Sequence, residues 1–240
     1  RGVSQSHRKP AVQGYFELDY TATDWLKLYA GVWGSSLWTG FADMETDFTA
    51  GARLTFGNFG LDIGNIYYYY PGGINPTAGL ANGSFDEAYI KPSYKFNDWL
   101  TVGGTFETGF NNFNDKALAP GVVWVGNAGH YYYSGNAVIT LPQFMPYGIV
   151  VSVNPEIGYE HYSNGVNANM GFSSDTFWDV GLDFVYKAVT LDLRYWDTNI
   201  NTPTATRGNQ CINAGAPGTN YCGSTFVATL KFDATLSGMK

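Results

Sequence analysis

The sequence predicts an all-β protein of one domain, residues 1–240, folded as a single closed antiparallel up-and-down barrel of about twelve strands. Three observations lead to this prediction. Polar and apolar residues alternate along most of the chain, whereas helical periodicity is hard to find. Short and long connections follow one another in turn between the predicted strands. Aromatic residues, which make up 17% of the chain, gather where those segments end.

The alternation has a direct structural meaning, because a strand places successive side chains on opposite faces. Residues 44–56 are the clearest case: Met44, Phe48 and Leu54 share one face, while Glu45 and Asp47 share the other. The same reasoning predicts strands over residues 1–6, 11–20, 25–37, 44–56, 59–70, 84–96, 99–109, 127–141, 147–161, 174–187, 189–199 and 224–236.

The connections indicate how the strands are joined. Short connections are predicted at residues 21–24, 57–58, 97–98, 142–146 and near 188, most of them with hairpin turn residues. Longer connections rich in Gly, Asn and Pro are predicted at residues 71–83, 110–126, 162–173 and 200–223. Tight turns at one end and long loops at the other are typical of outer-membrane barrels, where the turns are periplasmic and the loops face outward.

A soluble β-sandwich also alternates, so the surface composition has to separate the two folds. Charged residues make up only 14% of the chain, against about 25% in soluble domains. Tyr20 and Trp25 flank one short turn, and Phe96 and Trp99 flank another, as an interfacial aromatic girdle would. Aromatic packing at the edge of a sandwich core is the alternative. The pattern favours a transmembrane barrel with its apolar face toward the lipids and lipopolysaccharide of the cell outer membrane.

Charge and composition exclude other classes. A net charge of −7 without a Lys/Arg cluster argues against nucleic-acid binding. No apolar run approaches the roughly 18 residues of a spanning helix. The acidic stretch at residues 43–47 lacks the Gly and distal Glu of a calcium loop, so we expect no metal and no cofactor. Homo-oligomers and neighbouring membrane proteins stay open as partners.

Cys211 and Cys222 are the only two cysteines, and they are separated by ten residues. This spacing excludes a CxxC metal pair, and no His lies nearby. The sequence favours a disulfide over two unrelated thiols, and a disulfide indicates an oxidising compartment.

The polar faces of the strands supply the predicted lumen lining. In a barrel with its apolar face outward, acids outnumber bases along this lining by ten to four. An open lumen would then favour small cations, whereas an ion-paired lumen would be occluded, and both readings stay open. The predicted lining residues are Glu17, Asp19, Glu45, Asp47, Arg53, Glu87, Lys91, Glu107, Glu156, Asp179, Asp183, Asp192, Arg194 and Lys231.

One local motif invites an enzymatic interpretation. His161 and Ser163, followed by Asn164, look like the His-x-Ser-Asn segment of outer-membrane lipid A deacylases. A Ser beside a His that is oriented by an acid such as Asp175 would suit ester hydrolysis. Four residues are a small match, and an interfacial His-Tyr pair is the simpler interpretation. We therefore predict a protein without enzymatic activity.

Three stretches also resemble a known family. Residues 1–14 (RGVSQS, then PAVQG), residues 28–36 (LYAGVWGSS) and residues 190–198 (TLDLRYWDT) are similar to the opening, third and closing strands of the TorF-like porin family of Gram-negative bacteria. The resemblance implies an outer-membrane barrel of unproven activity. Together with the predicted acidic lumen, the resemblance predicts passive passage of ions or small polar solutes. The alternative is a closed structural or interaction barrel without conductance.

Overall fold

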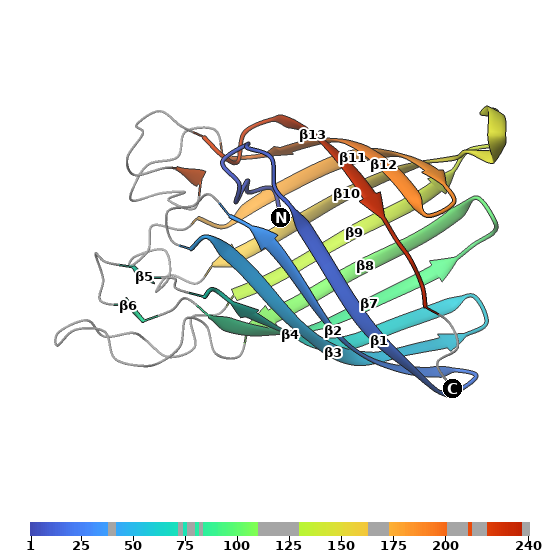
Figure 1. Ribbon diagram of the computed structural model, residues 1–240, viewed down its shortest axis with the longest axis horizontal. Helices are drawn as coiled ribbons and strands as arrows, with labels where there is room; N and C mark the ends of the chain where they lie inside the picture. The colour runs from blue at the N-terminus through green and yellow to red at the C-terminus, as the bar shows by residue number, and fades with distance from the viewer. Residues whose placement is uncertain are drawn as a thin grey trace.

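The computed structural model describes residues 1–37, 42–71, 74–75, 80–81, 84–109, 130–162, 173–200, 211–212 and 220–236. Eleven strands of this part form one antiparallel sheet in which each strand pairs with its neighbours along the chain (Figure 1). They are β1 (Gln13–Thr23), β2 (Leu26–Ser36), β3 (Met44–Phe56), β4 (Phe59–Tyr69), β7 (Phe85–Lys95), β8 (Leu100–Gly109), β9 (His130–Thr140), β10 (Val150–Tyr162), β11 (Asp175–Tyr186), β12 (Val189–Thr198) and β13 (Thr225–Phe232). A separate two-stranded sheet pairs β5 (Ile74–Asn75) with β6 (Leu80–Ala81).

The sheet confirms the all-β, up-and-down prediction, and its strands correspond to eleven of the predicted segments. β3 has the predicted bounds, 44–56, and it meets β4 through a two-residue turn in which Gly57 has a φ of 60°. β1 runs on to Thr23, where the sequence predicts a turn. β10 begins only at Val150, because residues 146–148 form a 3-10 turn in which Tyr147 has a φ of 61°.

The predicted strand at residues 1–6 is wrong. None of residues 1–6 is in a strand, and residues 5–9 form turns in which His7 and Arg8 have left-handed φ values of 52° and 61°. The Ser4 N–H donates to the carbonyl of Tyr221, 2.9 Å away, just before β13. Val3 is the only large apolar residue among residues 1–6, so a strand here would have placed little apolar surface on the convex face. We call residues 1–12 the N-terminal segment.

The described residues also do not show the closed barrel that the sequence predicts, and the sheet has eleven strands instead of about twelve. Within the described residues, no hydrogen-bonded ladder joins β13 to β1. With eleven strands in antiparallel order, β1 and β13 run in the same direction, whereas an even number would place them antiparallel. The sheet nevertheless curls so far that its edges meet. The Tyr15 hydroxyl at the start of β1 donates to the Asp233 carboxylate just after β13, at 2.5 Å.

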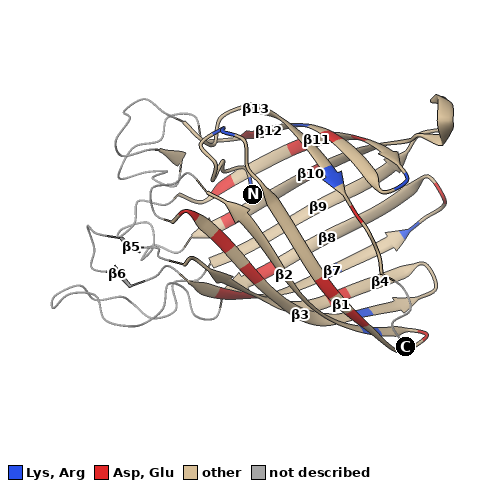
Figure 2. Ribbon diagram, in the orientation of Figure 1, with Lys and Arg blue, Asp and Glu red and all other residues tan. Residues whose placement is uncertain are grey.

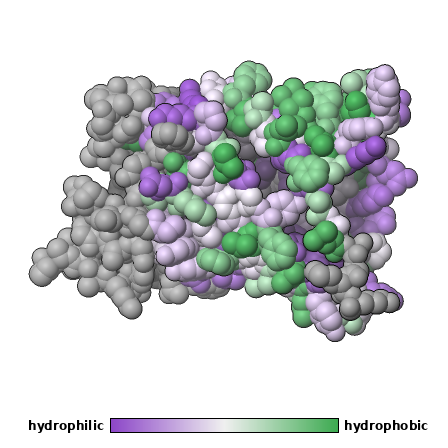
Figure 3. Space-filling model, in the orientation of Figure 1, coloured by the Kyte–Doolittle hydropathy of each residue, from purple (hydrophilic) through white to green (hydrophobic). Residues whose placement is uncertain are grey.

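The two faces of the curved sheet have inverted polarity. Acidic side chains on the concave face are buried: Glu45, Glu87, Glu107, Glu160, Asp175, Asp179 and Asp192. Large apolar side chains on the convex face are exposed, among them Phe16, Leu18, Leu28, Phe48, Ile63, Ile90, Phe106, Val180, Leu182, Leu191, Leu193 and Leu230. Figure 3 shows apolar patches across one outer side of the molecule. A soluble domain hides its apolar residues instead.

Aromatic side chains surround the end of the sheet where the short turns lie, which we call the short-turn end. Trp25 stacks on Phe56 with ring centroids 5.8 Å apart, and Tyr94 meets Phe96 edge-on at 4.8 Å. Trp99 and Tyr147 are exposed near the turns that follow. No helix among the described residues is long and apolar enough to cross a membrane.

The pairing register aligns eight concave-face residues in one row across eight strands, which we call the transverse row. The row consists of Tyr29, Gly51, Gly64, Tyr89, Glu107, Tyr132, Glu160 and Asp175. Tyr29 and Tyr89 lean toward each other over the two glycines until their hydroxyl groups are hydrogen-bonded. Glycine is needed beneath them, because a Cβ on Gly64 would lie 2.5 Å from the Tyr89 hydroxyl and 2.7 Å from the Ala50 carbonyl.

We therefore expect Gly64→Ala to destabilise the sheet by about 1–3 kcal/mol, the usual cost of overpacking a filled site. Gly135→Ala is the matched control, since no atom lies within 4 Å of its added Cβ. The temperature at which each variant loses its folded band on an SDS gel measures the difference. Equal transition temperatures for Gly64→Ala and Gly135→Ala would contradict the tyrosine–glycine packing.

Candidate functional site on the concave face

The charged residues of the concave face divide into three groups, each organised by one arginine. Figure 2 shows acidic segments on several strands near the end where the long connections lie, which we call the long-connection end. Arg1 organises the group at that end, Arg53 a group toward the short-turn end of β1 to β4, and Arg194 a group on β11 and β12. The sequence predicted which residues share this face but not these groups.

The Arg1 group brings together residues that are far apart in the chain. The guanidinium donates to the carboxylates of Glu87 on β7, Glu107 on β8 and Glu160 on β10, the last at 3.2 Å. It also lies over the Tyr132 ring, with the guanidinium carbon 4.6 Å from the ring centroid. Because an arginine stays charged at any physiological pH, it neutralises part of this buried negative charge permanently.

His130 strengthens the same group from β9. Its two ring nitrogens lie 2.7 Å from Glu87 and 2.8 Å from Glu160. An imidazole that donates from both nitrogens is in the positively charged form. Lys91 reaches Glu107 from the other side, with its ammonium nitrogen 3.2 Å from the carboxylate. Three carboxylates are thus held by three kinds of cation.

Several carboxylate oxygens near the long-connection end are buried without a hydrogen-bond partner among the described residues. They are one oxygen of Glu45, one of Asp47 and both of Asp175. Asp175 is fully buried and lies directly across from Glu160 in the transverse row. Buried carboxylates are ordinarily paired or hydrogen-bonded, so these oxygens mark places where the concave face has capacity for further donors.

The Arg53 group is more accessible. The Arg53 guanidinium makes a two-pronged contact with Glu17 at 2.7 and 2.8 Å, reaching from β3 past β2 to β1. It contacts Asp62 at 3.3 Å and lies over the Tyr29 ring at 3.9 Å. Asp19 is shared between Arg53 and Lys27, each at 3.4 Å. Because these side chains are partly exposed, their pairing contributes little to stability and mainly fixes their positions.

The Arg194 group lies on β11 and β12. Arg194 is ion-paired with Asp179 and with Asp192, the latter at 3.1 Å, and its guanidinium lies close above Gly181. Lys231 is 3.7 Å from Asp192. Asp183 lies directly opposite Asp192 in the register, and one of its oxygens has no hydrogen-bond partner in the described part of the chain.

Glu156 is held outside these groups, as the Tyr132 hydroxyl donates to it at 3.0 Å. Arg1, His130 and the tyrosines of the transverse row belong to the site but were not predicted from the sequence. The alternation around residues 130–134 places His130 and Tyr132 on one face, so that signal was present for β9. No local pattern marks Arg1, because its partners come from β7, β8 and β10.

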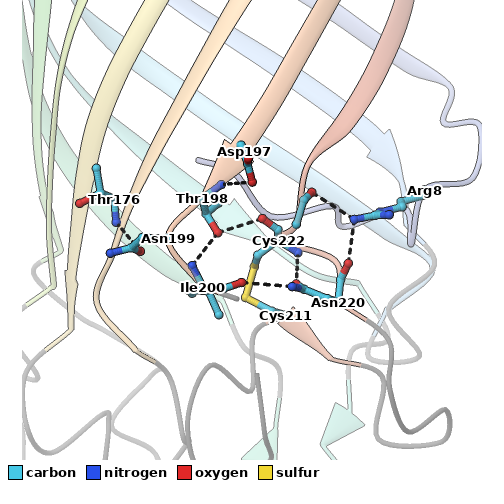
Figure 4. The surroundings of a disulfide bond; sticks show 10 residues. Arg8, Thr176, Asp197, Thr198, Asn199, Ile200, Cys211, Asn220 and Cys222 are labelled. Atoms are coloured by element: carbon cyan, nitrogen blue, oxygen red, sulfur yellow. Dashed lines mark hydrogen bonds between the residues drawn. A yellow bond between two sulfur atoms is a disulfide. The ribbon is translucent and has the colours of Figure 1, made fainter. Parts of the chain in front are cut away.

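The predicted disulfide is confirmed, and it braces the rim of the long-connection end (Figure 4). Cys211 and Cys222 are fully buried. The Thr198 hydroxyl at the end of β12 donates to the Cys222 carbonyl at 2.8 Å. The Asn220 side-chain amide donates to the Ile200 carbonyl at 3.1 Å. The bridge therefore links the residues after β12 to those before β13.

The N-terminal segment is attached to this braced rim. The Arg8 guanidinium donates to the carbonyls of Asn220 at 2.8 Å and Gly223 at 3.1 Å (Figure 4). The His7 ring stacks on Tyr221 with centroids 4.0 Å apart. Partial burial there lowers the pKa of His7, and the Lys9 charge acts in the same direction, so the ring is neutral at pH 7.

The geometry gives no support to the hydrolase motif. The His161 ring lies between the rings of Tyr131 and Tyr159 on the convex face, and its Nδ1 is 3.3 Å from the Ser174 hydroxyl. Asp175 does not orient it, because Asp175 belongs to the opposite face beside Glu160. Ser163 lies outside the described residues. Within the described ranges, no three His, Cys, Asp or Glu side chains are arranged to hold a metal ion.

Comparison with known proteins adds two findings. The model of a family described as "Bacterial protein of unknown function (Gcw_chp)" matches residues 1–226. A solved structure entitled "NanC porin structure in rhombohedral crystal form" is similar, with a TM-score of 0.55 and 9% sequence identity over 96% of each chain. No curated protein matches the sequence. At this identity the likeness shows a shared fold alone.

The disulfide gives a prediction for the rim. Cys211→Ser should leave the sheet folded, because the strand ladders form without it, but should increase proteolysis between Thr202 and Tyr221. In the chain-entropy model, so short a ring restricts the unfolded chain by roughly 3 kcal/mol. Limited proteolysis with mass spectrometry, with and without reductant, measures the effect. Equal cleavage under both conditions would show that packing alone holds the rim.

Proposed function

Because the chain belongs to the Gcw_chp family of bacterial proteins of unknown function, we propose a function for it from its own geometry: a channel in the bacterial outer membrane that passes ions or small polar solutes. The single observation that carries this proposal is the inverted polarity of the sheet. Acidic side chains are buried on the concave face, while Phe, Leu, Ile and Val side chains are exposed on the convex face. Lipid is the solvent in which that arrangement is favourable.

Strand length and aromatic placement support the membrane location. β1, β2, β4, β7 and β9 each have 11 residues, and a tilted strand that crosses a bilayer needs about 9–11. The exposed aromatic residues of the short-turn end, such as Trp25 and Trp99, are the type that gathers at membrane interfaces. The shared fold with a structure entitled as a porin supports the same proposal.

The proposal includes the closure of the sheet and its orientation in the membrane. In the membrane the sheet acts as a closed barrel whose seam lies between β1 and β13, where Tyr15 already reaches Asp233. The short turns are periplasmic and the long connections face outward. The protein resembles the TorF-like porins, and its transport is passive, with no enzymatic step and no cofactor.

A second function, a closed barrel that stiffens the membrane or presents its outer loops, is favoured by one observation. Arg1, Arg53 and Arg194 cross-link carboxylates of different strands, and such networks fill the space through which a solute would pass. Conductance separates the two functions.

Purified protein in a planar bilayer should conduct and should prefer K⁺ over Cl⁻, because acids exceed bases on the concave face. Glu17→Gln combined with Asp19→Asn should reduce this preference, measured as a shift of the reversal potential in a KCl gradient toward zero. The side chains of these two residues are 29% and 42% exposed on the concave face, so their charge can act on passing ions.

Asp98→Asn is the control for this measurement. Asp98 lies on an exposed short turn, and the hydrogen bond from Lys95 at 2.8 Å lowers the pKa of its carboxyl. Its neutralisation should leave the reversal potential unchanged. A preference for anions would contradict the acidic pathway, and an absence of conductance in folded protein would favour the structural barrel.

The hydrolase alternative has a direct assay. Purified wild-type protein and Ser163→Ala should both release no fatty acid from lipid A, since His161 lacks an orienting carboxylate among the described residues. Release that disappears in Ser163→Ala would restore the enzymatic interpretation.

A further inference from the structure

The Arg1 group has the form of an occupied binding site. Glu87, Glu107 and Glu160 come from three rigid strands and converge on one guanidinium, and the Tyr132 ring forms the floor beneath it. The Tyr68 hydroxyl accepts a further hydrogen bond at 3.3 Å. We propose that these residues form a binding site for the guanidinium group of a cationic solute, and that Arg1 occupies it as an internal substitute.

The chemistry of the site is selective. A guanidinium is planar and has five N–H donors, which suit two-pronged contacts with carboxylates and stacking on an aromatic ring. Glu87 provides such a two-pronged contact, since each of its oxygens accepts from a different Arg1 nitrogen. Tyr132 lies between Glu107 and Glu160 in the transverse row, so the strand register places the aromatic ring and the two flanking carboxylates side by side.

The environment of Asp175 gives separate support for a ligand at this site. It is fully buried, and neither carboxylate oxygen has a hydrogen-bond partner within the described residues. It lies next to Glu160 at the end of the row, beyond the contacts of the Arg1 guanidinium. With Arg1 in the site, both Asp175 oxygens thus have no hydrogen-bond donor among the described residues. A solute that carries an amine in addition to its guanidinium would satisfy both parts of the site.

Arg1 is attached in a way that allows displacement. Its partners are held in β-ladders, whereas the N-terminal segment is held at residues 4–9 by the rim contacts of Ser4, His7 and Arg8. Removal of the Arg1 side chain should thus leave the carboxylates in place. The role of the site in transport rests on the proposed channel, but binding can be measured without conductance.

The test uses agmatine, which carries one guanidinium and one amine, and the full chain folded in detergent. Isothermal titration calorimetry should show that Arg1→Ala binds agmatine at least tenfold more tightly than the wild type, because agmatine no longer competes with the chain's own guanidinium. Lys95→Ala is the matched control and should bind like the wild type, since it removes one positive charge far from the site, where Lys95 pairs with Asp98 on an exposed short turn.

Two further variants test the carboxylate contact and the role of the Arg1 charge. Arg1→Ala combined with Glu107→Gln should lose at least tenfold in agmatine affinity relative to Arg1→Ala. Arg1→Lys, which keeps the charge, covers the case in which Arg1→Ala does not fold, and it should still bind agmatine more tightly than the wild type. Urea, a planar but neutral analogue, should not bind any variant.

Equal agmatine affinity in the wild type and in the folded Arg1 variants would overturn the proposal, as would binding that is unaffected by Glu107→Gln. Bilayer recordings distinguish this failure from that of the channel. Conductance without agmatine binding would overturn the binding site alone. Agmatine binding by Arg1→Ala without conductance in any variant would support the site and overturn the channel.

Discussion

The burial of carboxylates on the concave face is the constraint on which the rest of the structure depends. A buried carboxylate is costly unless a cation or donor meets it. Each arginine offsets the charge of nearby carboxylates: Arg53 pairs with Glu17 and Asp62, and Arg194 pairs with Asp179 and Asp192. At the long-connection end no arginine on a described strand pairs with Glu87, Glu107 or Glu160, and Arg1 of the N-terminal segment does so instead.

The N-terminal segment serves the same constraint, because Arg1 pairs with Glu87, Glu107 and Glu160. The chain turns at residues 5–9 and is held on the disulfide-braced rim by Arg8. The rim contacts thus help to keep the Arg1 guanidinium among carboxylates that lie on three different strands.

In the transverse row, the pairing register brings residues from eight strands together on the concave face. Directly opposed residues share a face, so one alignment places Tyr29 and Tyr89 over two glycines and Tyr132 between two glutamates. A shift of one residue in any strand would move its members of the row to the convex face. The tyrosine contact and the guanidinium seat therefore depend on the same pairing.

The sequence by itself determined the strand positions and the side chains that share a face, because both follow from a period of two that is local to each segment. It also determined the disulfide, since the chain contains only Cys211 and Cys222. Only the tertiary structure decided that residues 1–6 fold back, that β13 does not pair with β1, and that Asp175 faces Glu160 rather than His161. These outcomes depend on register and curvature, which arise from pairing between segments as distant as Arg1 and Glu160 and leave no local pattern.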